Sequence, residues 1–547
     1  MYFDMEQKTI GGLISYAAKH WGDKAAAFSD SRNYTFKEID DLSDKFAFGL
    51  VKKGIKKGDR IGIWMHNHPE WNIAWFGVAK AGAIGVPLDY WYKAPETHYI
   101  AWHSEAKAII TTDAMFGVDF PGMVKEIKPS LPNLEFCVIM GKPSEPWMTS
   151  FEDIYKLGDG DSNSKELAER KSQIKERDLV FILYTSGTTG KPKGASLSHR
   201  NIIMNAWYTG AGLKVSDKDN ILVPVPYSHC FGNTLALTLA VLRGAAQTPM
   251  IAYDPKKALE YIEKYKCTAH HGVPTMFVRE VEALKEVKSD ASSLRTGIIA
   301  GAPCPEGLIK RVKDIIGCTL LNTYGQTEAS PVITMSIMGD DLAVLNSAVG
   351  KPIAGVEVKI VDPSTNEELP AGQQGELVCR GHCVMEGGYF KQPDKTKEAI
   401  DEGGWLHTGD LATQDEFGYY RITGRIKDMV IVGGFNVFPK IIEDHIIQHP
   451  KIQEVSVTGI KDYDLGEIVV AAVIPKNCQK IEPVEVVDWC YGKMSSAAVP
   501  RYVIITDKLP ISGRGKVQKF KLQEQFNELI KEGKIKKTAP TAAKVKK

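Results

Sequence analysis

The sequence predicts an α/β protein with two domains: a large N-terminal domain of parallel α/β sheets with a small antiparallel, barrel-like part, and a small α+β C-terminal domain. The first observation is length, because 547 residues exceed what one hydrophobic core normally organises. The second is an alternation of short apolar segments with helical segments between about residues 55 and 330. The third is a change after about residue 350, where strand-like segments follow one another between Gly, Pro and Asp turns.

The alternating part predicts parallel strands covered by helices. Strands are expected at residues 59–65, 83–88, 178–184, 221–225, 296–300 and 319–323. Helical patterns occupy residues 69–81, 255–265 and 305–315, and proline opens several of them, where its fixed φ angle suits the first turn. Alternating β and α elements favour a parallel sheet with helices on its faces.

The part after residue 350 predicts antiparallel structure and then a separate small domain. Strands are expected at residues 356–361, 375–380 and 419–422. The unit that follows combines strands at 455–460 and 468–474 with helices near 439–448, near 483–493 and after residue 516. We place the domains at residues 1–426 and 427–547, with a basic flexible tail from about residue 531.

Composition argues against several classes of function. The net charge of +1 provides no strong field to favour nucleic acid. No apolar stretch reaches the roughly 20 residues that span a bilayer, and the N-terminus lacks a basic-then-apolar signal pattern. The nine cysteines form no CxxC pair, which fits reduced thiols better than a zinc site. We therefore expect a cytoplasmic monomer or homodimer with small-molecule partners.

The strongest local signal is the segment YTSGTTGKPKG at residues 184–194, directly after a predicted strand. Glycine lets backbone N–H groups approach phosphate, hydroxyls donate further hydrogen bonds, and lysine adds positive charge. Because Pro192 follows the first lysine, the segment departs from the GxxxxGK[S/T] phosphate loop. Composition alone leaves a flexible surface loop open as the alternative. The candidate phosphate-binding residues are Thr185, Ser186, Gly187, Thr188, Thr189, Gly190, Lys191 and Lys193.

This loop and four further segments, in the same order, resemble the signatures of the adenylate-forming superfamily. The other segments are YGQTE at 324–328, WLHTGD at 405–410, GRIKD at 424–428 and PISGRGK at 510–516. The superfamily includes acyl- and aryl-CoA synthetases, adenylation domains of peptide synthetases, and luciferases. The resemblance extends from about residue 35 to residue 522, and five ordered motifs make a chance match very improbable.

The resemblance implies a role for each matching residue in the large domain. Tyr324 would stack on adenine, Thr327 would contact the α-phosphate, and Glu328 would help hold Mg²⁺, since a hard cation favours carboxylate and phosphate oxygens. Asp410 would accept hydrogen bonds from the ribose hydroxyls, and Arg425 would reach ribose or phosphate. Further contacts with the nucleotide are expected from Gly301, Ala302, Pro303, Gly325 and Gln326.

The small domain carries the remaining matches. Lys516 resembles the family's catalytic lysine, whose cation bridges the substrate carboxylate and the α-phosphate. Lys427 matches the hinge about which the small, mobile domain rotates between two half-reactions. Gly433 and Gly434 would line the tunnel for the pantetheine arm, with a tight turn between two strands as the alternative. Lys440 departs from the family, which usually has an acidic residue there.

The segment PYSHCFG at residues 226–232 resembles the acyl-pocket segment of the family. His229 and Phe231 would line the pocket, Gly301 and Ala302 would form the opposite wall, and Gly325 would lie near the floor. The amino-acid-activating relatives carry an aspartate in this stretch, but no acidic residue lies between 224 and 242 here. A buried ammonium without a counter-charge is unfavourable, so aromatic, alicyclic or medium-chain acids are expected. His229 as a core histidine remains the alternative.

The resemblance as a whole implies an acid–thiol ligase that uses ATP, Mg²⁺ and coenzyme A and forms an acyl-adenylate, in a reaction that is in principle reversible toward ATP. Three alternatives remain open. The adenylate could be loaded onto a separate carrier protein, or it could be oxidised, as in luciferases. A non-catalytic nucleotide or acyl-CoA sensor is disfavoured, because Lys516, Glu328 and Asp410 are all present.

Overall fold

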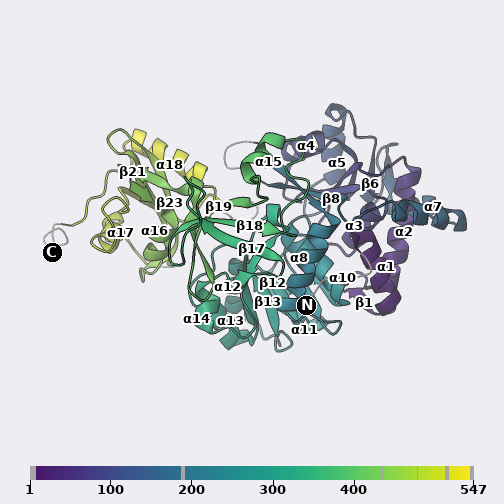
Figure 1. The fold of residues 1–547 in the computed structure, drawn as a ribbon, viewed down its shortest axis with the longest axis horizontal. Helices are drawn as coiled ribbons and strands as arrows, with labels where there is room; N and C mark the ends of the chain where they lie inside the picture. Colours follow the sequence, from purple (N-terminus) through teal and green to yellow (C-terminus); the bar gives the residue numbers. More distant parts are fainter. Residues whose placement is uncertain (1–7, 186–190, 434, 477–478, 512–516, 542–547) are drawn as a thin grey trace. The chain divides into compact units, whose positions relative to one another are not determined.

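The computed structural model describes residues 8–185, 191–433, 435–476, 479–511 and 517–541 (Figure 1). By its internal contacts the chain divides into two compact units, Met1–Val358 with Cys379–His407, and Lys359–Val378 with Thr408–Lys547. The expected boundary between residues 426 and 427 falls within the second unit and stays a prediction about where the small domain moves.

The first unit contains a seven-stranded sheet in the order β7-β6-β5-β3-β4-β8-β9. Neighbouring strands from β7 to β8 are parallel, and β9 pairs antiparallel with β8. Most residues of these strands are buried, as expected for a parallel sheet covered on both faces. The strands are β3 (Arg60–Trp64), β4 (Ile84–Pro87), β5 (Ala106–Thr112), β6 (Phe136–Met140), β7 (Met148–Ser150), β8 (Leu179–Thr185) and β9 (Lys193–Ser198).

The same unit contains a nine-stranded sheet in the order β16-β15-β14-β13-β12-β10-β11-β1-β2. Strands β1, β11, β10, β12, β13 and β14 are parallel, so their carboxyl ends share one edge. The strands are β1 (Ala25–Ala27), β2 (Tyr34–Thr35), β10 (Asn220–Val223), β11 (Ala246–Pro249), β12 (Ala269–Gly272), β13 (Thr296–Ile299), β14 (Thr319–Gly325), β15 (Val332–Met335) and β16 (Lys351–Pro352).

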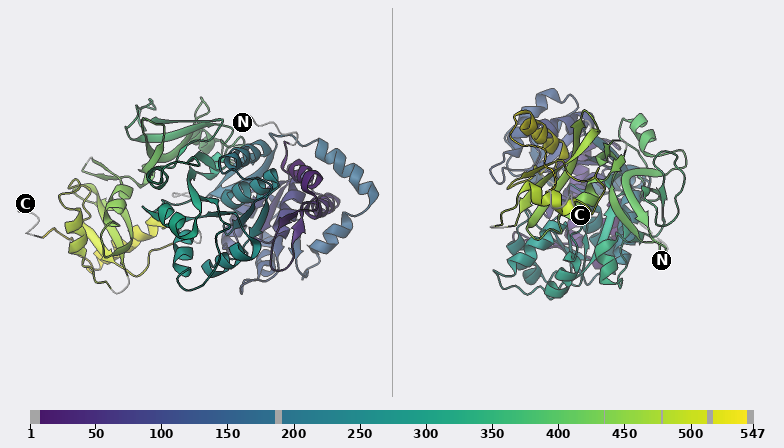
Figure 2. Two further views of the ribbon diagram at one scale, coloured as in Figure 1. Left: turned by 90° about the horizontal axis from the view of Figure 1, so that it is seen from below. Right: turned by 90° about the vertical axis from the view of Figure 1, so that its left-hand side faces the viewer.

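Helices flank both sheets of the first unit (Figure 2). They include α1 (Ile10–Trp21), α2 (Phe36–Lys52), α3 (Glu70–Lys80), α4 (Ala94–His103), α5 (Phe120–Ile127), α6 (Phe151–Leu157), α7 (Asp161–Ser172), α8 (His199–Gly212), α9 (Cys230–Gly232), α10 (Leu239–Arg243), α11 (Pro255–Tyr265), α12 (Pro274–Ala283), α13 (Leu308–Ile316), α14 (Leu342–Ser347) and α15 (Pro393–Ala399). Short 3₁₀ turns lie at η1 (Lys128–Ser130) and η3 (Thr327–Ala329), and a π-helical turn lies at η2 (Asn233–Thr238).

Local sequence explains how these helices start and pack. Thr35 and Glu38 form a capping box at the start of α2, which satisfies backbone donors that the helix leaves open. Lys80 of α3 is fully buried, and its ammonium lies 2.5 Å from a carboxylate oxygen of Asp40 and 2.6 Å from one of Asp44. Since both carboxylates belong to α2, this ion cluster fixes α3 against α2.

The antiparallel part that the sequence predicts is a four-stranded sheet in the order β17-β18-β19-β20. Its strands are β17 (Val356–Val361), β18 (Gly375–Gly381), β19 (Leu406–Gln414) and β20 (Tyr420–Arg425). The β19–β20 pairing is antiparallel, and Asp410 lies directly opposite Arg425 in its register. The 3₁₀ turn η4 (Ile426–Asp428) follows β20.

The C-terminal part of the second unit is an α+β fold, as the sequence predicts. Alternate residues of β24 point to opposite faces of the sheet. Val469, Ala471 and Val473 pack with α16 and α17, whereas Ile468, Val470 and Ala472 pack with α18. Both faces are thereby covered. The elements are β21 (Val430–Val432), β22 (Phe435–Val437), β23 (Ile452–Asp462), β24 (Gly466–Pro475), β25 (Tyr502–Ile505), α16 (Pro439–Ile446), α17 (Pro483–Cys490) and α18 (Lys519–Lys531).

The tail expected from about residue 531 is partly held against this fold. The backbone N–H of Thr538 donates to the carbonyl of Arg501 at 2.9 Å. Thr541 donates to the Asp488 carboxylate from its backbone N–H at 2.8 Å and from its hydroxyl at 2.9 Å. The expectation of a free tail is therefore corrected as far as Thr541, because these bonds dock it.

Within the described residues, no helix combines the length and the apolar character that crossing a bilayer requires.

Candidate active site

The predicted phosphate loop connects two strands that pair with each other at the edge of the seven-stranded sheet. Thr185 ends β8 and lies opposite Lys193, which begins β9. The Tyr99 hydroxyl donates to the carbonyl of Pro192 at 3.1 Å, and the Lys191 ammonium lies 5.5 Å from the centre of the Tyr99 ring. The sheet therefore anchors both ends of the loop. Ser186, Gly187, Thr188, Thr189 and Gly190 lie outside the described residues.

Glu328 is the buried centre of this part of the site. It follows β14 on the turn η3, at the carboxyl edge of the nine-stranded sheet. Its Oε1 accepts hydrogen bonds from the Tyr389 hydroxyl at 2.8 Å and from the Thr185 hydroxyl at 3.4 Å. The structure thus brings Thr185 and Glu328 together, as the sequence motifs imply. Because ligands bind at the carboxyl ends of strands in open α/β sheets, this is the expected place for a nucleotide.

Sequence analysis missed Tyr389, which lies between β18 and α15. Its segment pairs with β9: Tyr389 bridges to Ala195, and Phe390 donates to the carbonyl of Gly194 at 2.8 Å. The Lys193 ammonium lies 4.2 Å from the centre of the Tyr389 ring. Burial, reinforced by the neighbouring Glu328 carboxylate, raises the pKa of Tyr389, so its hydroxyl stays protonated and donates.

Thr327 faces the predicted acyl-binding residues through Cys230. The Cys230 sulfur lies 3.8 Å from the Thr327 hydroxyl and 3.7 Å from Nδ1 of His229. His229 precedes α9, and its Nδ1 accepts a hydrogen bond from the backbone N–H of Phe231 at 3.2 Å. His229, Phe231 and Thr327 therefore belong to one connected group of contacts. Cys230 links them, and no motif pointed to this cysteine.

A second histidine lies beside this group. The rings of His271 and Phe231 are nearly parallel, with 18° between their planes and 6.4 Å between their centres. His271 is fully buried on β12, and burial lowers its pKa to about 3, so the ring is neutral at ordinary pH. No motif points to His271.

The remaining predicted residues of the first unit lie at the carboxyl ends of β13 and β14, which are neighbours in the sheet. Gly301 lies in the loop after β13 with φ +83°, a conformation that favours glycine, and Ala302 and Pro303 follow it on the surface. Tyr324 is half-buried at the end of β14. A β-carbon on Gly325 would overlap the carbonyl oxygen of Pro331. That same oxygen accepts a hydrogen bond from the backbone N–H of Gln326 at 3.0 Å.

In the second unit, the structure pairs two of the predicted ribose-binding residues with each other. Nε of Arg425 lies 2.8 Å from Oδ1 of Asp410, which is buried. The backbone N–H of Asp410 donates to the Thr408 hydroxyl at 3.1 Å, and that of Gly409 donates to Glu376 at 2.9 Å. This network orients the Asp410 carboxylate, and the contact of Asp410 with ribose stays a prediction.

The predicted hinge and tunnel residues also lie in the second unit. Lys427 lies on η4. Gly433 has φ +58° at the turn between β21 and β22, which agrees with the tight-turn interpretation, and its role in a tunnel stays a prediction. Gly434 and Lys516 lie outside the described residues. Ile511 and Val517, on either side of the Lys516 loop, form a β-bridge.

The donor set around Glu328 suits magnesium bound together with a nucleotide. In the described part of the chain, no three His, Cys, Asp or Glu side chains gather into a group that could hold a metal ion. A single carboxylate beside a hydroxyl is the arrangement in which Mg²⁺ takes its other ligands from phosphates and water. The residues therefore fit Mg²⁺ that arrives with ATP.

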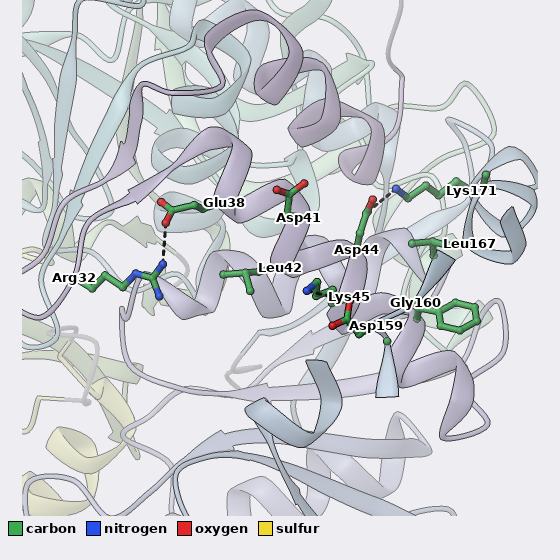
Figure 3. A pocket seen from close by; sticks show the side chains of 13 residues that line it. Arg32, Glu38, Asp41, Leu42, Asp44, Lys45, Asp159, Gly160, Leu167 and Lys171 are labelled. Atoms are coloured by element: carbon green, nitrogen blue, oxygen red, sulfur yellow. Dashed lines mark hydrogen bonds and ion pairs between the residues drawn. The ribbon is translucent and has the colours of Figure 1, made fainter. Parts of the chain in front are cut away.

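A cavity of about 670 Å³ lies elsewhere in the first unit, between α2 and the segment from Gly158 to Lys171 (Figure 3). Most of its charged side chains already pair with one another: Arg32 with Glu38, Lys45 with Asp159, and Asp44 with Lys171. None of the predicted site residues lines it, so this cavity is not the candidate active site.

Comparison with known proteins identifies the family. The model of the AMP-binding enzyme family matches residues 14–390, and that of the AMP-binding enzyme C-terminal domain matches residues 441–516. The chain therefore belongs to the AMP-binding enzyme family.

Three similar proteins are named as acyl-CoA or aryl-CoA ligases or synthetases. YngI of Bacillus subtilis (strain 168), assigned as an acyl-CoA synthetase, is 39% identical over 543 residues, covering 96% of this chain and 98% of that protein. The mitochondrial medium-chain acyl-CoA ligase ACSF2 of Danio rerio is 35% identical, covering 96% and 89%. The crystal structure of the anthranilate CoA ligase AuaEII with anthranoyl-AMP superposes with a TM-score of 0.85 at 27% identity, covering 95% and 98%.

These comparisons confirm the family resemblance and the predicted fold class. They also confirm the expectation of an AMP-forming acyl-CoA synthetase whose substrates are a carboxylic acid, ATP and coenzyme A. Loading of a separate carrier protein and a non-catalytic sensor are not favoured.

Replacing Gly325 with alanine tests how tightly the turn that carries Thr327 and Glu328 is packed. The added β-carbon must displace the backbone at Pro331, and overpacking of this kind typically costs about 1–3 kcal/mol. We expect the dissociation constant for ATP, measured by isothermal titration calorimetry, to rise about tenfold. A variant that binds ATP as the wild type does would show that the turn tolerates the shift.

Proposed function

We propose that this acyl-CoA synthetase activates medium-chain or ring-containing acids, that Thr185 and Thr327 hold the phosphates of Mg·ATP, and that Glu328 holds its Mg²⁺. The observation that carries the proposal is the hydrogen bond between Thr185 and Glu328, which joins the phosphate loop to the turn after β14. The segment that begins at Thr185 contains glycine, hydroxyl and lysine groups in its sequence, and Glu328 contributes a carboxylate. That combination suits a magnesium-bound triphosphate.

Two observations support the class of acid. The relatives include a medium-chain acyl-CoA ligase and an anthranilate CoA ligase, whose substrates are an aliphatic and an aromatic acid. The acyl-pocket candidates combine an aromatic ring and a histidine from the segment at 226–232 with small residues of the loop after β13, a composition that would suit an apolar chain or a ring. No acidic side chain lies between residues 224 and 242 to balance an ammonium group, which disfavours amino acids.

In the first half-reaction, the substrate carboxylate attacks the α-phosphorus of ATP in line, and pyrophosphate leaves. The loop from Thr185 to Lys193 holds the departing phosphates, and Thr327 donates to the α-phosphate. Lys516 neutralises the charge that develops between the two reacting anions, where a fixed cation acts mainly on the transition state. When bound, Mg²⁺ neutralises phosphate charge beside Glu328. Asp410 holds the ribose, which fixes the direction of attack.

In the second half-reaction, the small domain rotates about Lys427, which removes Lys516 and admits the thiol of coenzyme A. The thiol attacks the acyl carbon of the mixed anhydride, and AMP leaves. Gly433 and Gly434 offer the pantetheine arm a path without side chains. Lys516 therefore acts in adenylation only, because the rotation removes its ammonium before the thiol attacks.

We place the enzyme in the cytoplasm as a monomer or homodimer. The eight cysteines of the described residues are all free thiols, which suits a reducing compartment. The Danio rerio relative is named as mitochondrial, so imaging of a fluorescently tagged chain decides between the two compartments.

A substrate panel tests the proposed acid class. Pyrophosphate release is measured with benzoate, cyclohexane carboxylate, hexanoate, acetate, palmitate and phenylalanine, with and without coenzyme A. We expect steady turnover to require coenzyme A and to be highest with a ring or medium-chain acid. Acetate should be at least tenfold slower than hexanoate, because apolar pockets discriminate by about 1–3 kcal/mol per methylene. Turnover confined to acetate or palmitate contradicts the pocket assignment.

Replacing Lys516 with alanine separates the two half-reactions. Adenylation should fall about 100- to 1000-fold, the range seen when a transition-state charge loses one stabilising group. Thioester formation from supplied acyl-AMP and coenzyme A should largely survive. Lys521 to alanine, which removes an exposed lysine of α18, is the control and should change neither rate. Equal loss of both half-reactions in the Lys516 variant means that the assigned role is wrong.

A further inference from the structure

The two carboxylate oxygens of Glu328 have different surroundings. Oε1 accepts the hydrogen bonds from Tyr389 and Thr185, at 2.8 and 3.4 Å. Within the described part of the chain, Oε2 accepts no hydrogen bond that would compete with a ligand. The carboxylate is also buried, so it exchanges little with water. Oε1 is therefore used in hydrogen bonds within the protein, and Oε2 is the oxygen that can coordinate a cation.

Tyr389 is held firmly enough to fix the orientation of this carboxylate. Its backbone N–H donates to the hydroxyl of Thr396, in α15, at 2.9 Å, and its backbone bridges to Ala195 of β9. The ring packs beneath the Lys193 ammonium, 4.2 Å from the ring centre. The backbone of Glu328 is held as well, because its carbonyl accepts from the N–H of Met385 at 2.9 Å. Both ends of the Tyr389–Glu328 bond are thus anchored.

We propose that Tyr389 is a positioning residue for metal binding: its hydroxyl occupies Oε1 of Glu328 and presents Oε2 to the magnesium ion of Mg·ATP. This inference rests on the proposed function of Glu328. The Tyr389 ring also contacts the Lys193 ammonium. The Tyr389 side chain therefore positions both the Glu328 carboxylate and the Lys193 ammonium. Loss of the hydroxyl frees the carboxylate to rotate, and the loss of such outer partners typically lowers metal affinity 10- to 100-fold.

The test uses Tyr389→Phe, which keeps the ring and its contact with Lys193 and removes the hydroxyl alone. Tyr34→Phe is the matched control, because the buried Tyr34 hydroxyl also donates to a glutamate, Glu70, at 2.8 Å, in the same unit. The two variants lose the same kind of bond, but only one of them touches Glu328. Thermal unfolding of both variants reports any general loss of stability.

Two binding readouts are independent of turnover. Calorimetry gives the ATP dissociation constant with excess Mg²⁺ and with EDTA, and electron paramagnetic resonance gives the affinity for Mn²⁺ in the presence of a non-hydrolysable ATP analogue. For Tyr389→Phe we expect the gain in ATP affinity from Mg²⁺ to shrink at least tenfold, with metal-free binding unchanged and Mn²⁺ affinity lowered to match. Tyr34→Phe should behave as the wild type in both assays.

If Tyr389→Phe folds poorly, a second variant tests the same role of Tyr389. Thr396→Val removes the anchor of the Tyr389 backbone, and a smaller loss of the Mg²⁺-dependent gain is expected. A full Mg²⁺-dependent gain in the folded Tyr389 variant overturns the inference and leaves the proposed function intact. A wild-type enzyme whose ATP affinity is indifferent to Mg²⁺ overturns the metal role of Glu328 itself, and the inference with it.

Discussion

The buried carboxylate of Glu328 is the interaction on which the site depends. A charged group away from water requires fixed partners, and this one draws them from two other parts of the chain. Thr185 ends a strand of the seven-stranded sheet, Glu328 follows a strand of the nine-stranded sheet, and Tyr389 comes from the segment after β18. The requirement to satisfy one carboxylate thus brings the carboxyl edges of the two sheets to the same place.

The carboxyl edge of the nine-stranded sheet also carries the candidates for binding the acid. His229 follows β10 and Gly301 follows β13, and His271, which contacts Phe231, lies on β12 between these two strands of the parallel sheet. Cys230 links this group to Thr327 by its contacts with both neighbours. The acyl-pocket candidates and Thr327 therefore lie on loops at the same edge of the nine-stranded sheet, a placement that would suit a reaction between a carboxylate and a phosphorus atom.

The motifs and the apolar periodicity predicted most of the fold, because each element there depends on local sequence. The helix expected at 255–265 and the strand expected at 356–361 have these bounds in the structure. Glu328 and Asp410 could be predicted as candidates because they lie within motifs. Tyr389 was not, since its role arises only from a hydrogen bond to Glu328, 61 residues away, and from pairing with β9. Arg425 was expected to face the nucleotide, yet its bond to Asp410 follows from strand register, which the motifs do not encode.

The most direct test of this account is the affinity for ATP of a Glu328→Gln variant, measured by calorimetry with Mg²⁺ and with EDTA. Glutamine keeps the size of the side chain and an oxygen that can accept from Tyr389, and it removes the charge. The account predicts that metal-free ATP binds about as it does to the wild type, whereas the gain in affinity from Mg²⁺ disappears. A variant that keeps the full gain would contradict the claim that this carboxylate organises the magnesium–nucleotide site.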